Sequence, residues 1–216
     1  MYSKEIIAGF MKVATASVSD AVDKITGSRG FMDQAIKPRI NENKIVGPAV
    51  TIMEVPSEKF VPPQHALDAI DESAPGSVIV IGINAETNVA VWGGLMAAGA
   101  EVNQLAGAVL DGGVRDVTEI RRDSGFQVFA RSVSPATTLG RFETISHNEP
   151  VECGGIQVFP GDLIVGDIDG VVVVPKDQVE PVLKMATEIE EREAEQARLI
   201  RETGSLREGL AKYGRI

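Results

Sequence analysis

The residues best suited to chemistry stand in one stretch, Gly107-Ala108-Val109-Leu110-Asp111-Gly112-Gly113-Val114-Arg115-Asp116. Its apolar first half predicts a buried strand at 108–111. The glycines that follow predict a turn into a helix, which would leave backbone N–H groups free at the carboxyl edge of a sheet. Arg115 can bind a carboxylate through two hydrogen bonds, and Asp116 offers a hard oxygen ligand for Mg²⁺. The stretch predicts a site for a small anion and a metal; the alternative is an ordinary turn with both side chains on the surface.

A second segment, Val91-Trp92-Gly93-Gly94-Leu95-Met96, leads into a predicted helix over 94–104. The first N–H groups of a helix have no acceptor within it, so they can bind an anion. The segment is not a P-loop, because no Gly-Lys-Ser/Thr follows. The alternative is a tight turn into a buried helix.

A third candidate is the acidic run Glu190–Glu195 on a helix predicted from residue 176 to about 202. Val179, Leu183, Ala186 and Ile189 give the first half of this helix an apolar face, whereas its later turns are almost wholly polar. Such a helix can extend past its own domain to a neighbouring subunit. Glu190 and Glu193 share a face that could point into a partner's site; the alternative is a solvated charged face.

Other chemistries find little support. The two histidines and one cysteine match no zinc spacing, and no nucleophile elbow occurs. His65 is expected to be a partly buried histidine on a helix, His147 to lie in a loop, and Cys153 to be a small buried residue.

The order of predicted elements indicates the α/β class. Helices are expected over 1–13, 19–25, from Pro62 to Pro75, and over 116–122. Strands are expected over 45–55 (interrupted near Pro48), 77–83 and 127–130, and the alternation predicts a partly parallel sheet. Beyond Pro135, short strands at 151–153, 156–159, 163–165 and 171–174 predict a small all-β layer. Nothing divides the chain, so residues 1–216 are expected to form one domain.

The 216-residue chain has a formal net charge of −10 and a pI near 4.8, so it would repel phosphate backbones and nucleic acid is not an expected partner. No apolar run is long enough to span a bilayer, and the N-terminal residues read as an amphipathic helix rather than a signal peptide. A single cysteine suits a reducing compartment. A cytoplasmic protein without membrane contact is expected.

Three segments together resemble one known family: Trp92–Ala98, Leu110–Val117 and Pro160–Pro175. The family contains the 4-hydroxy-4-methyl-2-oxoglutarate / 4-carboxy-4-hydroxy-2-oxoadipate aldolases and the regulators of ribonuclease E activity. Some of its members carry an old label as dimethylmenaquinone methyltransferases, for which the sequence offers no cofactor loop. The resemblance implies a swivelling β/β/α domain that forms trimers or hexamers, with the C-terminal helix reaching a neighbouring subunit.

The resemblance also implies an activity: cleavage of 4-hydroxy-2-oxo diacids to pyruvate by a class II aldolase that uses Mg²⁺ or Mn²⁺, together with oxaloacetate decarboxylation. Asp116 is then the metal ligand, and Arg115 binds the substrate's oxygens and stabilises developing negative charge. The segment Gly93-Gly94-Leu95-Met96 holds the pyruvyl carboxylate on the N–H groups of Leu95 and Met96. A glutamate from the adjacent subunit, Glu193 or else Glu190, completes the site.

One position departs from the family pattern. The aldolases carry an aspartate, which reaches the metal through water, where this chain has Gly94. The loss of such an outer carboxylate commonly weakens metal affinity roughly 10–100-fold. The alternative function is a non-catalytic trimeric regulator or binding protein, but the regulators lack the aspartate of the Arg-Asp pair, which this chain keeps.

Overall fold

The computed structural model describes residues 2–214 and has a mixed α/β architecture built on a nearly closed sheet. Its main path of strands runs in the order β1-β6-β5-β3-β2-β10-β11, with β4 added to β5 and β7 added to β2. The strands of this sheet are β1 (Lys37–Pro38), β2 (Ile45–Pro56), β3 (Val78–Gly82), β4 (Ala90–Trp92), β5 (Gly107–Val114), β6 (Val128–Val133), β7 (Phe142–His147), β10 (Leu163–Asp167) and β11 (Gly170–Val174).

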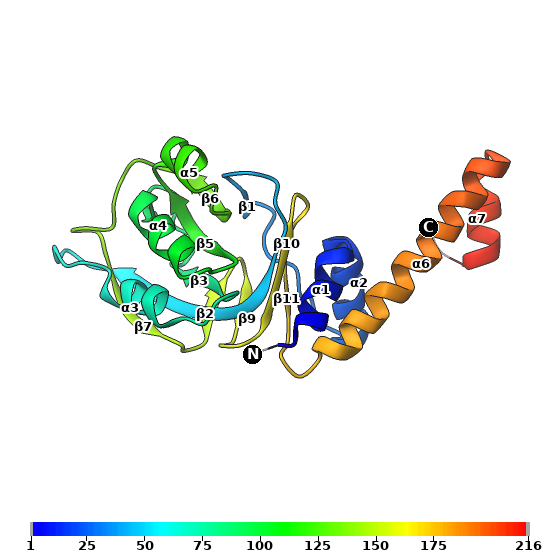
Figure 1. Cartoon of the computed structure of the whole chain (residues 1–216), viewed down its shortest axis with the longest axis horizontal. Helices are drawn as coiled ribbons and strands as arrows, with labels where there is room; N and C mark the ends of the chain where they lie inside the picture. The colour runs from blue at the N-terminus through cyan, green and yellow to red at the C-terminus, as the bar shows by residue number, and fades with distance from the viewer. Residues whose placement is uncertain (1, 215–216) are drawn as a thin grey trace.

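The half of the sheet formed by β2, β3, β5 and β6 is parallel, as the alternation of elements predicts. Helices α3 (Gln64–Glu72), α4 (Gly94–Val102) and α5 (Val117–Asp123) cover one of its faces (Figure 1). Aliphatic side chains such as Ile52, Ile79, Ile81 and Leu110 form the core beneath these helices, and Trp92 is buried with them. Parallel strands buried on both faces need this continuous apolar character.

The other half of the sheet is antiparallel. β10 pairs with the first residues of β2, and β11 pairs with β10. Helices α1 (Lys4–Lys12), α2 (Thr15–Thr26) and α6 (Val179–Thr203) pack on this half around a second core that includes Phe10, Val18, Val182 and Ile189.

The expected all-β layer is therefore only partly right. A two-stranded sheet of its own forms from β8 (Val151–Cys153) and β9 (Ile156–Val158), but β10 and β11 join the main sheet. The reason is the length of β2, whose residues Ile45–Pro48 extend beyond β3 and remain free to pair with β10. The interruption expected near Pro48 is wrong, because β2 continues through it. Pairing with β3 begins only at Ala49, so β3 needs no N–H from the proline.

Contacts between Phe31 and Val172 bring the sheet close to closure. These two residues form an isolated antiparallel bridge, and Met32 N–H donates to Val171 O at 2.9 Å. The segment before β1 thereby lies against β11, while β1 itself pairs with β6 at the far edge.

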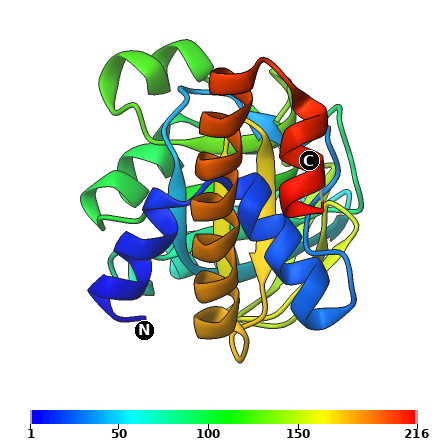
Figure 2. The same cartoon turned by 90° about the vertical axis from the view of Figure 1, so that its right-hand side faces the viewer.

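The C-terminal helices project from the body. Figures 1 and 2 show α6 crossing the outside of α1 and α2 and continuing beyond them, with α7 (Leu206–Tyr213) folded back along its end. α6 matches the expected helix over 176–202 closely, whereas α7 was not predicted. Within residues 2–214 no helix is long and apolar enough to cross a membrane.

Several element boundaries differ from those expected. α1 begins at Lys4 after the capping Ser3, and α2 begins at Thr15 rather than at residue 19. His147, expected in a loop, ends strand β7, where it pairs with Ile52. β5 runs on to Val114, so Gly112 and Gly113 lie within the strand rather than in a turn.

Candidate functional site

The site forms where two neighbouring parallel strands, β4 and β5, end beside each other. Trp92 pairs with Val114, and the N–H of Arg115 donates to Trp92 O at 3.0 Å. Each strand then leads directly into a helix, β4 into α4 through Gly93 and β5 into α5 through Asp116. Because parallel strands place their carboxyl ends at one edge, the two predicted segments come together.

Asp116 occupies a left-handed conformation, with φ of 58°, at the N-cap of α5. Its Oδ2 accepts the N–H of Gly94, the first residue of α4, at 3.0 Å, and lies 3.5 Å from Nε of Arg115. A positive φ is strained for a residue other than glycine. It is compensated here by a carboxylate that satisfies one amide at the positive end of α4.

Gly93 is required by this arrangement. A Cβ at position 93 would lie 2.8 Å from Oδ2 of Asp116 and 3.1 Å from Nε of Arg115, so only glycine lets the Arg-Asp pair approach the start of α4. Gly113 has a different role, because its N–H donates to Val89 O at 2.9 Å. The expectation that the glycines after residue 111 leave free N–H groups is thus wrong for Gly113, since β5 continues through it.

Asp111, in the same stretch, is a buried structural residue. Its Oδ1 accepts from Nε of Arg131 at 2.7 Å and from the N–H of Gly154 at 2.9 Å, and its Oδ2 accepts from the N–H of Ala85 at 2.7 Å. These bonds tie the β8–β9 hairpin and the loop after β3 to the main sheet, so Asp111 does not contribute to the cavity.

One cavity of about 450 Å³ brings the two predicted segments, 93–96 and 115–116, together. It is lined at one end by Gly93, Gly94, Leu95, Met96, Arg115 and Asp116. Leu95 and Met96 lie in the first turn of α4, whose N–H groups have no acceptor within the helix. This end therefore combines an arginine, a carboxylate and a helix N-terminus, which suits the recognition of a small carboxylate ligand.

Glu119 is a site residue that the sequence reasoning did not select. It lies in the first turn of α5, and its Oε2 is 3.6 Å from the point that a Cβ on Gly94 would occupy. The same point is 3.6 Å from Cβ of Asp116, and both acidic residues line a second, smaller cavity that adjoins Gly94. A carboxylate thus stands next to the position where the family pattern has its aspartate. The i,i+3 spacing of Asp116 and Glu119 on a short helix is the signal that could have identified it.

The two candidate glutamates of α6, Glu190 and Glu193, lie at different places on this helix. Oε1 of Glu190 accepts the N–H of Ala14 at 2.6 Å and the hydroxyl of Ser17 at 3.1 Å, so this carboxylate is used at the start of α2 in its own chain. Glu193 lies one turn further along, on the exposed part of α6. Figure 1 shows α6 at the opposite end of the molecule from α4 and α5, so Glu193 can reach an Asp116 only on another chain.

The two histidines lie together, although they stand far apart in the sequence. Nδ1 of His65 on α3 is 3.3 Å from Nδ1 of His147 on β7, and both side chains are half-buried. One ring nitrogen must donate and the other accept. Neither histidine lines the cavity of Arg115 and Asp116.

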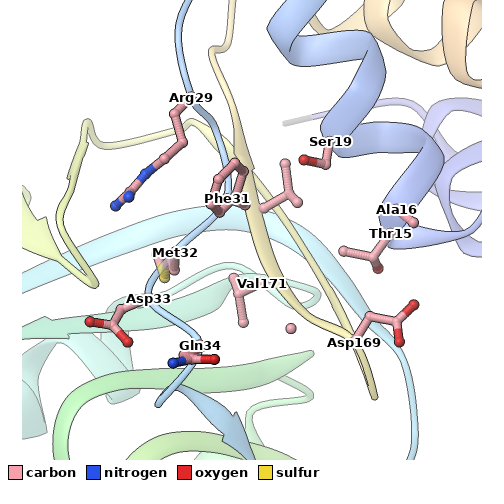
Figure 3. A pocket seen from close by; sticks show the side chains of 12 residues that line it. Thr15, Ala16, Ser19, Arg29, Phe31, Met32, Asp33, Gln34, Asp169 and Val171 are labelled. Atoms are coloured by element: carbon pink, nitrogen blue, oxygen red, sulfur yellow. The ribbon is translucent and has the colours of Figure 1, made fainter.

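A larger cavity, of about 580 Å³, lies between α2 and the segment beside β11 (Figure 3). Two of its charged groups, Asp33 and Arg29, already have partners in the protein. Asp33 pairs with Arg131 at 3.2 Å, and Arg29 lies over the ring of Phe31, 5.0 Å from its centroid. Figure 3 shows Arg29 and Asp33 on the opposite side of this cavity from Thr15 and Asp169. No charged groups converge there as they do at Arg115 and Asp116.

Comparison with known proteins identifies the family of this chain. The model of the RraA-like family, described as Aldolase/RraA, matches residues 15–173. The chain belongs to the RraA-like family. A relative from Halalkalibacterium halodurans named "Putative 4-hydroxy-4-methyl-2-oxoglutarate aldolase" is 35% identical over 186 residues, which cover 84% of this chain and 82% of the relative.

Solved structures show the same RraA-like fold. An uncharacterized protein from Pseudomonas syringae superposes with a TM-score of 0.88 at 28% identity, covering 98% of this chain and 95% of that one. RraAS2 from Streptomyces coelicolor, described as an unusual member of the RNase ES inhibitor RraA protein family, has a TM-score of 0.84 at 25% identity, covering 92% and 99%. The family implied by the sequence motifs is thereby confirmed, and its relatives include both named aldolases and named inhibitors.

Proposed function

We propose that this RraA-like protein is a divalent-metal-dependent lyase that cleaves a 4-hydroxy-2-oxo acid to pyruvate and also decarboxylates oxaloacetate. The observation that supports it is the convergence of Arg115, Asp116 and the N-terminus of α4 on one cavity. Both reactions pass through the enolate of pyruvate, so a single anion-stabilising site serves both.

The donor set suits Mg²⁺ or Mn²⁺. Asp116 is about one-third exposed, and Glu119 provides a second carboxylate beside it. Within residues 2–214 no group of three or more potential ligands forms, and Mg²⁺ commonly binds one or two carboxylates while keeping several waters. When bound by Asp116, with Glu119 acting through water, the cation would supply a Lewis acid for the substrate's 2-oxo group.

The residues of this chain then divide the remaining work. The N–H groups of Leu95 and Met96 hold the carboxylate of the 2-oxo acid at the start of α4. As the C4 hydroxyl loses its proton to water and becomes a carbonyl, the C3–C4 bond breaks, its electron pair passes to C3, and negative charge develops on the C2 oxygen. C3 then takes a proton from water to give pyruvate. The guanidinium of Arg115 donates to that oxygen.

The proposal includes a homo-oligomer, a trimer or a hexamer, whose sites lie between subunits. Glu193 of a neighbouring chain completes each site through the water around the cation. Its exposed position on the projecting α6 supports this role, whereas Glu190 bonds to the start of α2 in its own chain.

A coupled assay of pyruvate release from oxaloacetate and from 4-hydroxy-4-methyl-2-oxoglutarate tests the function. We expect EDTA to abolish turnover, Mg²⁺ or Mn²⁺ to restore it, and Asp116→Ala to remove it. Arg115→Ala should lower kcat roughly 100- to 1,000-fold, as for the loss of one anion-stabilising donor. Asp71→Ala, which removes an exposed carboxylate on α3, is the control.

Full activity in Asp116→Ala would contradict the metal-ligand assignment. Absence of turnover on every 2-oxo acid, together with stoichiometric capture of a protein partner, would favour the regulatory function instead.

A further inference from the structure

The cavity at Arg115 and Asp116 has two chemically different ends. The polar end holds the Arg-Asp pair and the first turn of α4. The other end is lined mainly by apolar groups, from Phe60, Pro62 and Pro63 before α3, Leu67 on α3, and Leu139 in the loop before β7. A substrate with its 2-oxo acid at the polar end must place its distal group against this apolar wall.

The described residues that line the cavity include one cation, Arg115. Two other cations lie on nearby segments, but both are used elsewhere. Nζ of Lys59 pairs with both carboxylate oxygens of Glu143 at 3.0 Å, and Nη1 of Arg141 donates to the carbonyls of Thr137 and Leu139 at 3.1 and 3.3 Å. With Arg115 bound to the oxygens of the 2-oxo acid, no lining cation remains for a second carboxylate.

A neighbouring subunit would not correct this imbalance through Glu193. Residues three and four positions away share its helix face, and these are Ile189, Glu190, Gln196 and Ala197. Their side chains add no positive charge. A distal carboxylate would therefore meet a mainly apolar wall, which also includes Thr137 and Thr138, and further negative charge. No cation in the described lining would offset the hydration that it gives up there.

Resting on the proposed aldolase function, we propose that the preferred substrate is a 4-hydroxy-2-oxo acid whose distal end is uncharged and apolar, rather than a diacid. An alkyl group at that end gains free energy by leaving water. Retro-aldol cleavage then releases pyruvate and a neutral ketone or aldehyde. Oxaloacetate still fits as a side reaction, because its distal carboxylate leaves as CO₂, and poor solvation of that carboxylate favours its loss.

A matched pair of substrates tests the inference. 4-Hydroxy-4-methyl-2-oxoglutarate carries a distal carboxylate, whereas 4-hydroxy-4,5-dimethyl-2-oxohexanoate carries an isopropyl group of similar shape in its place. Cleavage releases two pyruvates from the diacid and one from the isopropyl compound. With this counted, pyruvate release should show a kcat/KM roughly tenfold or more in favour of the isopropyl compound, about the discrimination that an apolar pocket achieves.

A preference for the diacid would overturn the inference while leaving the aldolase function intact. If the protein cleaves neither of the two compounds and does not decarboxylate oxaloacetate, the aldolase function would be overturned, and with it the inference.

A variant that places a cation at the apolar end of the cavity provides a second test of the inference. Leu67 on α3 lines the apolar end and is about one-third exposed, so Leu67→Arg can be accommodated at the surface. This variant should shift the kcat/KM ratio roughly tenfold or more towards the diacid. Two control variants should not shift this kcat/KM ratio towards the diacid. Leu67→Gln is polar but uncharged, and Val102→Arg lies on the exposed end of α4, away from the cavity. Equal shifts in Leu67→Arg and Val102→Arg would contradict the assignment of this wall.

Discussion

At the scale of single residues, the most specific feature of the site is that Glu119 places a carboxylate beside Gly94, where the family pattern has an aspartate. Gly94 lacks the side chain that the family pattern has, while Oε2 of Glu119 lies 3.6 Å from where that side chain would begin. The two positions lie on different helices, α4 and α5, so their equivalence is visible only once both helices start at the same sheet edge.

This juxtaposition gives a rescue prediction. Glu119→Ala should weaken the apparent affinity for Mg²⁺ roughly 10–100-fold, as the loss of an outer carboxylate does, with kcat at saturating Mg²⁺ much less affected. Gly94→Asp in the same variant should restore affinity, because a Cβ there meets nothing closer than 3.6 Å. Titration of pyruvate release with Mg²⁺ measures both. Unchanged affinity in Glu119→Ala would show that Glu119 takes no part in holding the cation.

At the scale of elements, the sequence predicts what local chemistry determines and misses what distant partners determine. The buried strands around Val78 and Leu110, the helix after Gly93 and the long helix after Lys176 follow from apolar runs and helical periodicity, and the structure contains all of them. The start of α2 could not be found in this way.

α2 begins at Thr15, before its predicted start at residue 19, because carboxylates far along the chain satisfy its first amides. Asp167 accepts the N–H of Thr15 at 3.1 Å, and Glu190 accepts the N–H of Ala14. In the site, too, local sequence predicted some features and contacts between distant segments determined the others. The motifs indicated Arg115 and Asp116, but only the β4–β5 pairing shows that Gly94 and Asp116 are in contact.

The cap on α2 can be tested directly. Glu190→Ala should lower the free energy of unfolding by about 1 kcal/mol, the usual cost of losing a helix cap. Glu191→Ala, an exposed neighbour on the same helix, should change it by less than about 0.5 kcal/mol. Urea denaturation of both variants provides the comparison. Equal effects would contradict a capping role, and a selective loss of activity in Glu190→Ala would return Glu190 to consideration as the partner-chain glutamate.

Strand β2 carries a buried acid that the catalytic proposal does not use. Glu54 is 1% exposed, neither of its oxygens has a hydrogen-bond partner within residues 2–214, and burial raises its pKa to about 8. Between its ordinary value of 4.5 and about 8, the folded chain holds this proton and the unfolded chain does not. The free energy of unfolding should therefore fall as pH rises through this window, by up to about 1.4 kcal/mol per pH unit.

Denaturation at several pH values checks this contribution. Glu54→Gln keeps a neutral side chain of the same shape, so it should remove this part of the slope. Glu58→Gln, at an exposed position just after β2, should retain it. A slope that is identical in the original protein and in Glu54→Gln would mean that Glu54 is ionised in the folded chain.

At the scale of the whole molecule, the separation of α6 from α4 and α5 determines how a complete site can form. Helices α4 and α5, at whose starts the cavity lies, are at the opposite end of one chain from α6, which carries Glu193 (Figure 1). A site that uses both must therefore draw them from two chains. In a closed ring, each chain gives its Asp116 to one site and its Glu193 to another.

Mixing two inactive variants tests this geometry. Asp116→Ala and Glu193→Ala should each be nearly inactive alone. When they are unfolded together and refolded at equal concentrations, roughly one quarter of all sites should combine an intact Asp116 with an intact Glu193, because each is contributed independently. Pyruvate release should therefore recover to about a quarter of the original rate, while the separately refolded variants stay inactive. A mixture that sediments as mixed oligomers yet remains inactive would exclude a site shared between neighbouring chains.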